Sequence, residues 1–94
     1  ITLKYQLKLS NQTIEIEICQ TFLKRLLGFM FRKKKITTGK LFPHCHSIHT
    51  FFMFQKIDVI VCNQDMEIMN LKKEFPPNHI LLPIQGASCI LELP

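Results

Sequence analysis

The chain has 94 residues and a mass of 11.0 kDa, which is the size of one small domain and excludes most multidomain enzyme architectures. Hydrophobic residues make up 47% of it, so the composition is that of a folded domain and excludes a disordered tail or a collagen-like chain. Twelve Lys and Arg against seven Asp and Glu give a net charge of +5, which leaves an anionic partner open.

The N-terminal region has the alternating pattern of a β-hairpin. Apolar and polar residues alternate over 3–9 and again over 14–18, which is the period of half-buried strands. Ser10-Asn11-Gln12 between them is typical of a turn. Lys side chains on the first strand and Glu side chains on the second are expected to pair across the hairpin.

The next segment changes to a helical period. The apolar residues at this spacing are Leu23, Leu26, Leu27 and Met30. With Thr21 suited to the N-cap, they predict one short helix over residues 21–29. A basic loop over 32–40 follows.

The remainder of the chain predicts short strands separated by turns. The runs that favour strands are Lys40–Pro43, Ile48–Phe54, Ile57–Cys62, Glu67–Lys73, Ile80–Ile84 and Ser88–Leu93. Turn signals about every 8–12 residues are typical of an all-β sandwich or barrel. We therefore expect residues 1–94 to form a single, mainly β domain: a small sandwich or barrel-like fold of short antiparallel strands with one short helix.

The cysteines indicate a reducing environment. They are Cys19, Cys45, Cys62 and Cys89. Their wide spacing, without a C-x-x-C pair, favours reduced and mostly buried thiols and so a cytoplasmic location. Residues 1–20 do not resemble a signal peptide, and no apolar run approaches the roughly 20 residues of a transmembrane helix.

The positive charge is concentrated in one region. Residues 18–57 contain eight Lys and Arg and no acid, so they carry +8, whereas residues 58–94 carry −3 from two Lys against five acids. The densest cations are Arg32, Lys33, Lys34 and Lys35. They suit an anionic surface such as nucleic acid, anionic lipid or an acidic partner; the alternative is a solvated loop that aids solubility.

The densest group of possible metal ligands follows the basic loop. Cys45, His49 and Met53 recur every fourth residue, and thiolate, imidazole and thioether suit Zn or Cu. The alternative is a hydrogen-bonded His49 and a Met53 that fills the core. A further alternative is a thiol-dependent hydrolase or transferase, with Cys45 as nucleophile, His46 or His49 as base and Asp58 as the orienting group.

Asp58 lies in an otherwise apolar predicted strand. A carboxylate there must be paired or hydrogen-bonded, because burying it otherwise is costly. Arg25 is a natural partner, and a backbone-satisfied Asp58 is the structural alternative; a pocket carboxylate that recognises a ligand is the functional one. Glu92, between Leu91 and Leu93, poses the same question.

Four blocks in order resemble a known family, domain-of-unknown-function family 192. They are Arg25-x-x-Gly28-x-Met30-Phe31-Arg32, Pro43-x-Cys45-x-Ser47-Ile48-His49-Thr50-Phe51-Phe52-Met53, Lys56-Ile57-Asp58-Val59-Ile60 and Ile90-Leu91-Glu92-Leu93-Pro94. The resemblance covers about residues 18–94 and implies a compact, mainly β domain without an established activity. Members generally continue past the last block through a Gly, which leaves open that a final C-terminal strand is missing here.

We therefore expect a non-enzymatic binding or accessory protein with a site near His49, Met53 and Asp58. The candidate binding residues are Arg25, Arg32, His49, Thr50, Met53 and Asp58. They combine polar groups with an apolar setting, as small-ligand and partner sites do. No cofactor is required by this hypothesis, and Zn or Cu belongs to the metal-binding alternative.

Overall fold

The structure is a computed structural model that describes residues 3–8, 12–21 and 28–94. Its strands are β1 Leu3–Lys8, β2 Thr13–Ile18, β3 Gly39–Pro43, β4 Ile48–His49, β5 Ile57–Asn63, β6 Ile68–Phe75, β7 Ile80–Leu81 and β8 Ala87–Leu93. Within the described ranges there is no helix, so the mainly β fold class is confirmed. Residues 22–27 of the predicted helix, Arg25 among them, lie outside the described residues, while Gly28 and Phe29 lie in a turn.

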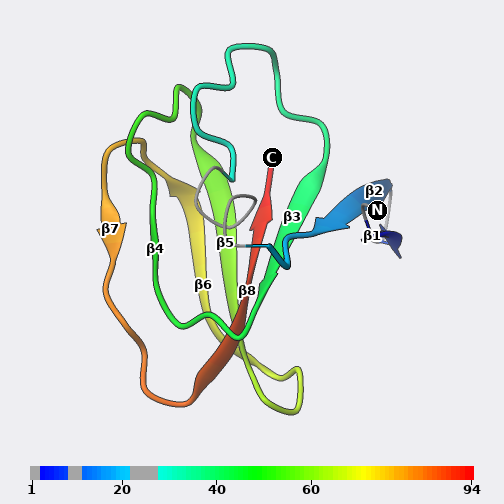
Figure 1. Ribbon diagram of the computed structural model, residues 1–94, viewed down its shortest axis with the longest axis vertical. Helices are drawn as coiled ribbons and strands as arrows, with labels where there is room; N and C mark the ends of the chain where they lie inside the picture. Colours follow the sequence, from blue (N-terminus) through cyan, green and yellow to red (C-terminus); the bar gives the residue numbers. More distant parts are fainter. Residues whose placement is uncertain (1–2, 9–11, 22–27) are drawn as a thin grey trace.

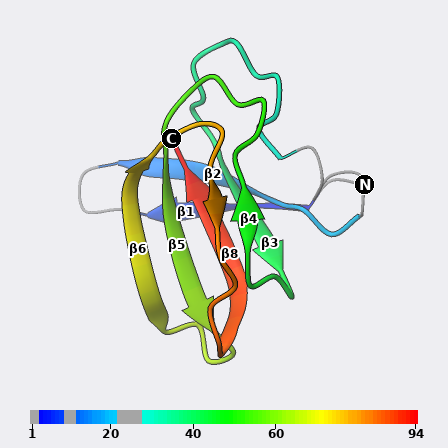
Figure 2. The same cartoon turned by 90° about the vertical axis from the view of Figure 1, so that its left-hand side faces the viewer.

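The strands form one large and one small sheet. The large sheet has the order β1-β2-β3-β8-β5-β6, and β4 pairs with β7 in a two-stranded sheet along one side of it (Figures 1 and 2). The predicted antiparallel pairing is wrong at one place, because β2 and β3 run parallel with Ile16 opposite Gly39. A parallel pair needs a crossover connection, which residues 19–38 provide.

The N-terminal hairpin forms as the alternation predicts. β1 and β2 pair antiparallel, with Leu7 opposite Ile14. Lys4 Nζ lies 3.2 Å from Glu15 Oε1 across the hairpin, although both side chains are about half exposed. Such an exposed pair contributes little stability, so the register depends mainly on the apolar face of β2, where Ile14 and Ile16 are buried.

Two apolar clusters cover opposite faces of the central strands. One joins alternate residues of β5 and β8 to the small sheet and to loops: Phe29, Ile36, Met53, Ile57, Val59, Val61, Leu81 and Ile90. The other joins Leu91 and Leu93 of β8 to Ile14 and Ile16 of β2. Because successive side chains of a strand point to opposite faces, β8 contributes Ile90 to the first cluster and Leu91 to the second.

Two predicted strands are shorter in the structure. Only Ile48–His49 of the expected strand Ile48–Phe54 forms β4, because the chain turns at 51–52 and Phe52 adopts a φ of 63°. Only Ile80–Leu81 of Ile80–Ile84 forms β7. In the part of the chain that the structure describes, no helix is long and apolar enough to cross a membrane.

Candidate functional site

Three loops meet at one end of the sheets, above β5 in Figure 1. Thr50, which is fully buried, holds two of them together. Its hydroxyl donates to the carbonyl of Pro76 at 2.7 Å and accepts from the His79 N–H at 2.9 Å. Its backbone also accepts from the Asn78 N–H and donates to the His79 carbonyl, each at 2.8 Å. The segments after β4 and after β6 are therefore fastened together.

A pair of exposed phenylalanines joins the third loop. The Phe31 N–H donates to the Phe52 carbonyl at 2.9 Å, and the two rings stack with centroids 5.4 Å apart and planes 23° from parallel. Asn78 Oδ1 accepts the Phe52 N–H at 3.1 Å. Phe31 and Phe52 both have positive φ, an uncommon backbone state for bulky residues that this set of contacts maintains.

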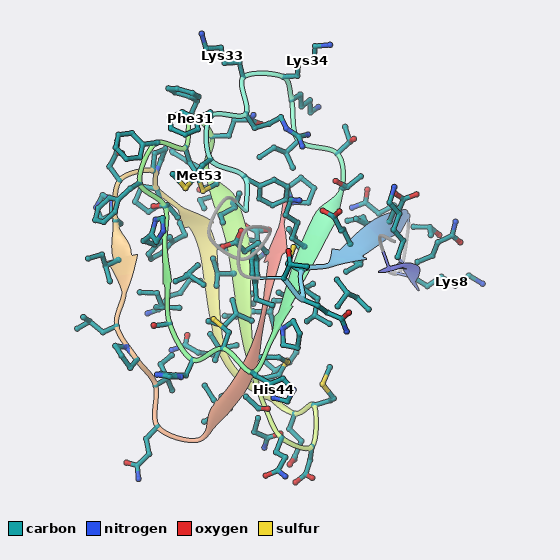
Figure 3. All side chains as sticks on the ribbon, viewed as in Figure 1. Lys8, Phe31, Lys33, Lys34, His44 and Met53 are labelled. Carbon is teal, nitrogen blue, oxygen red and sulfur yellow. The ribbon has the colours of Figure 1, made fainter. Side chains whose placement is uncertain are left out.

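Gln55 fixes the basic loop beside these rings. Its Nε2 donates to the carbonyls of Arg32 and Lys34 at 3.2 and 2.6 Å, and its Oε1 accepts the Ile36 N–H at 2.9 Å. Ile36 is buried in the core and anchors the end of the loop. The cationic side chains before it remain exposed, and Figure 3 shows Lys33 and Lys34 pointing outward above Phe31.

We call the exposed side chains at this end the apical surface. It consists of Phe31, Phe52 and Phe54 with Arg32, Lys33, Lys34 and Lys35. The three phenylalanines are 58%, 57% and 56% exposed, which is unusual for large apolar side chains. An apolar and cationic surface on braced loops can bind a partner without rearranging first.

The predicted site residues lie around and beneath this surface. His49 is half-buried, stacks on Phe51 with centroids 5.2 Å apart, and accepts the Phe51 N–H at Nδ1. Met53 is buried in the first core cluster. Half-buried Asp58 accepts the Glu74 N–H at Oδ1, 2.9 Å away, which is the backbone-satisfied arrangement. Arg32 is exposed, and Arg25 lies outside the described residues.

The residues of the predicted metal site are engaged in different places. Cys45 Sγ donates to the Ser47 carbonyl at 2.9 Å, and its N–H donates to Ser88. Its neighbour His44 lies at the opposite end of the molecule from Met53 in Figure 3. Among the described residues, no group of three or more His, Cys, Asp or Glu side chains is placed to hold a metal ion.

Three ionisable side chains from β2, β3 and β8 lie close together and largely buried. Lys40 of β3 forms an ion pair with Glu17 of β2 and lies 5.4 Å from the centre of the Phe29 ring. Glu92 is opposite Lys40 in the β3–β8 register and is 3% exposed. Burial raises the pKa of Glu92 to about 8, and the nearby Lys40 opposes this shift. The sequence signal for this cluster is Glu92 between two leucines, but the sequence does not show which cation lies opposite it.

Comparison with known proteins places the chain in a family. The DUF192 family model, described as an uncharacterized ACR, matches residues 5–94. The chain belongs to the DUF192 family. UPF0127 protein PH1112 of Pyrococcus horikoshii is 33% identical to it over 84 residues, which cover 85% of this chain and 72% of that protein. UPF0127 protein PF1050 of Pyrococcus furiosus is 34% identical over 85 residues, or 86% of this chain and 72% of that protein.

Solved structures share the DUF192 fold at lower identity. A protein of unknown function from Novosphingobium aromaticivorans matches 98% of this chain and 72% of its own with a TM-score of 0.75 and 18% identity. A structure from Sinorhizobium meliloti matches 94% of this chain and 75% of its own with a TM-score of 0.72, again at 18% identity. At this identity the likeness shows the fold alone, and the family carries no assigned activity.

Proposed function

We propose that this domain is a non-enzymatic binding protein whose apical surface docks on anionic lipid membranes. The observation that carries the proposal is the exposure of Phe31, Phe52 and Phe54 on the same braced loops as four consecutive cations, Arg32 to Lys35. Exposed aromatic side chains enter the interface between headgroups and acyl chains, and Lys and Arg beside them attract anionic headgroups.

The predicted residues have supporting positions in this proposal. Thr50 fastens the loop after β4 to the loop after β6, and Met53 packs beneath them in the core. Asp58 ties the start of β5 to the end of β6 through the Glu74 N–H. In this proposal, the region near His49, Met53 and Asp58 supports the apical surface from below. Arg32 lies on that surface and contacts the lipid headgroups directly.

The arrangement of the rings favours lipid over nucleic acid. Phe31 and Phe52 stack on each other, so one face of each ring is already covered. Single-stranded nucleic acids are bound by stacking bases on free aromatic faces, whereas insertion into a bilayer requires only exposed apolar surface. Cysteines without disulfide bonds fit a cytoplasmic location, and the cytoplasmic leaflet is the anionic one.

The test is binding to vesicles of phosphatidylcholine alone or mixed with phosphatidylglycerol, measured by co-sedimentation. We expect binding only to the mixed vesicles, and weaker binding when salt rises from about 0.05 M to about 0.5 M. The double variant Lys33→Ala/Lys34→Ala should lose roughly 30-fold in affinity, since each cation near an anionic membrane contributes about 1 kcal/mol. Phe54→Ser should weaken binding without altering its salt dependence.

Matched controls come from other exposed positions. Lys72→Ala/Lys73→Ala on β6 removes the same charge elsewhere, and Leu82→Ser removes an apolar side chain that is 73% exposed. Both controls should bind like the wild type. Equal losses in the controls, no binding to mixed vesicles, or binding to DNA oligonucleotides with none to vesicles would each refute membrane docking by this surface.

A further inference from the structure

Sulfur atoms gather at the end of the molecule opposite the apical surface. Cys62 of β5 and Cys89 of β8 are directly paired across the sheet. Side chains of such partners have Cβ atoms about 4.5–5.5 Å apart, so both thiols can reach one ion. Both residues are buried, at 7% and 6% exposed.

A thioether completes the group. Met66 Sδ lies 3.7 Å from Cys89 Sγ, although the Met66 side chain as a whole is 61% exposed. The turn that carries Met66 closes β5 onto β6 at the lower end of Figure 1. Asn63 orders this turn, because its Oδ1 accepts the N–H groups of Asp65 and Glu67, each at 2.9 Å.

The Met66 backbone is held in an uncommon state. Its φ is 63°, a left-handed conformation that Gly or Asn adopts more readily, and its N–H donates to the Asn63 carbonyl at 3.0 Å. The turn therefore places a long, soft side chain over two buried thiols while leaving it open to solvent, which provides an entry path for an ion.

We propose that Cys62, Cys89 and Met66 form a binding site for a soft monovalent metal ion, Cu(I), with two thiolates and one thioether as ligands. Soft thiolate and thioether ligands suit Cu(I), Zn and iron–sulfur clusters. Structural zinc takes four ligands from Cys, His and carboxylates, and the described residues hold no group of three or more such side chains. The three-sulfur set therefore fits Cu(I) better than Zn(II).

Binding exchanges protons for the metal without any electron transfer. Cu(I) forms one bond to each thiolate, and each thiol releases its proton to the solvent. Because both thiols lose their protons when the metal binds, the apparent affinity should rise with pH.

The test is an anaerobic titration of the reduced protein with Cu(I) buffered by bathocuproine disulfonate. We expect one ion per chain, with sulfur as the only ligand element in X-ray absorption spectra. Cys62→Ala and Cys89→Ala should each lower the affinity by about 100-fold or more, and Met66→Leu by about tenfold. The affinity of the wild type should rise with pH as stated.

Matched variants separate this site from general thiol binding. Cys19→Ala removes another buried thiol and Met69→Leu another exposed methionine, and both should retain the wild-type affinity. Circular dichroism shows whether each variant is folded. Failure to bind one Cu(I), nitrogen or oxygen ligands in the spectra, or folded Cys62→Ala and Cys89→Ala variants with unchanged affinity would overturn the proposal.

Discussion

Glu92 shows how one buried carboxyl group affects the whole domain. It lies opposite Lys40 at 3% exposure, close to the turn at Gly28, where an added Cβ would lie 3.8 Å from its Oε1. Lys40 is already paired with Glu17, so the cation is shared and burial outweighs its attraction. Glu92 therefore keeps its proton at neutral pH, with a pKa of about 8.

The raised pKa of Glu92 predicts a pH-dependent stability. The unfolded chain releases this proton near pH 4.5 and the folded chain near pH 8, so the folded state binds more protons between these values. The free energy of unfolding should fall by a few kcal/mol, to order of magnitude, as the pH rises through this window. Glu92→Gln should flatten the dependence in urea unfolding, whereas exposed Glu74→Gln should not. Parallel curves for wild type and Glu92→Gln would contradict this account.

At the scale of one element, the basic loop depends on a residue outside it. Gln55 makes three hydrogen bonds to the backbone of residues 32–36, and Ile36 enters the core beyond them. A loop with four adjacent cations would otherwise repel itself and sample many conformations. The conformation of the basic loop is therefore fixed by the neutral side-chain amide of Gln55 on the neighbouring loop.

Gln55→Ala should release this loop. The loss of three hydrogen bonds is expected to make trypsin cleavage after residues 32–35 about tenfold faster, because local opening then costs less free energy. Gln64→Ala, at an exposed position of the β5–β6 turn, is the matched control and should be cleaved at the wild-type rate. Equal cleavage of the two variants would show that Gln55 does not hold the loop.

At the scale of the whole molecule, the central strands separate two cores. β8 contributes Ile90 to the cluster beneath the small sheet and Leu91 to the cluster beneath β2. The central strands are therefore covered on one face by the β4–β7 pair and pack on the other against β2, which belongs to the same large sheet (Figure 2). Loss of packing on either face should be felt by the same strands.

Ile90→Ala should destabilise the entire domain by about 2–5 kcal/mol, because it leaves a cavity at a fully buried position. Ile80→Ala removes the same atoms at a position that is 56% exposed and should cost less than about 0.5 kcal/mol. Urea unfolding should show a shifted midpoint and an unchanged slope for Ile90→Ala. Similar midpoints for the two variants would refute this description of the core.

Local signals determined the elements that the sequence predicts correctly. Alternation identified the hairpin and β6, a run of β-branched residues identified β5, and four short motifs identified the family, because each signal is contained within a few neighbouring residues. The sequence also predicts Arg32, Thr50 and Met53 as site residues, and in the structure Arg32 is exposed while Thr50 and Met53 are buried. The spacing of these residues in the sequence does not show that Arg32 is an exposed cation, that Thr50 joins two loops and that Met53 fills the core.

Only the tertiary structure decided which distant residues meet. The parallel β2–β3 pair, the Thr50 contacts with 76–79 and the union of Cys62, Cys89 and Met66 all depend on strand order and register. A strand's own sequence specifies which side chains share a face, but its neighbours are selected by burying that face against the rest of the chain. The sequence likewise shows a net charge of +5, but only folding places exposed phenylalanines beside the densest cations and so forms the apical surface.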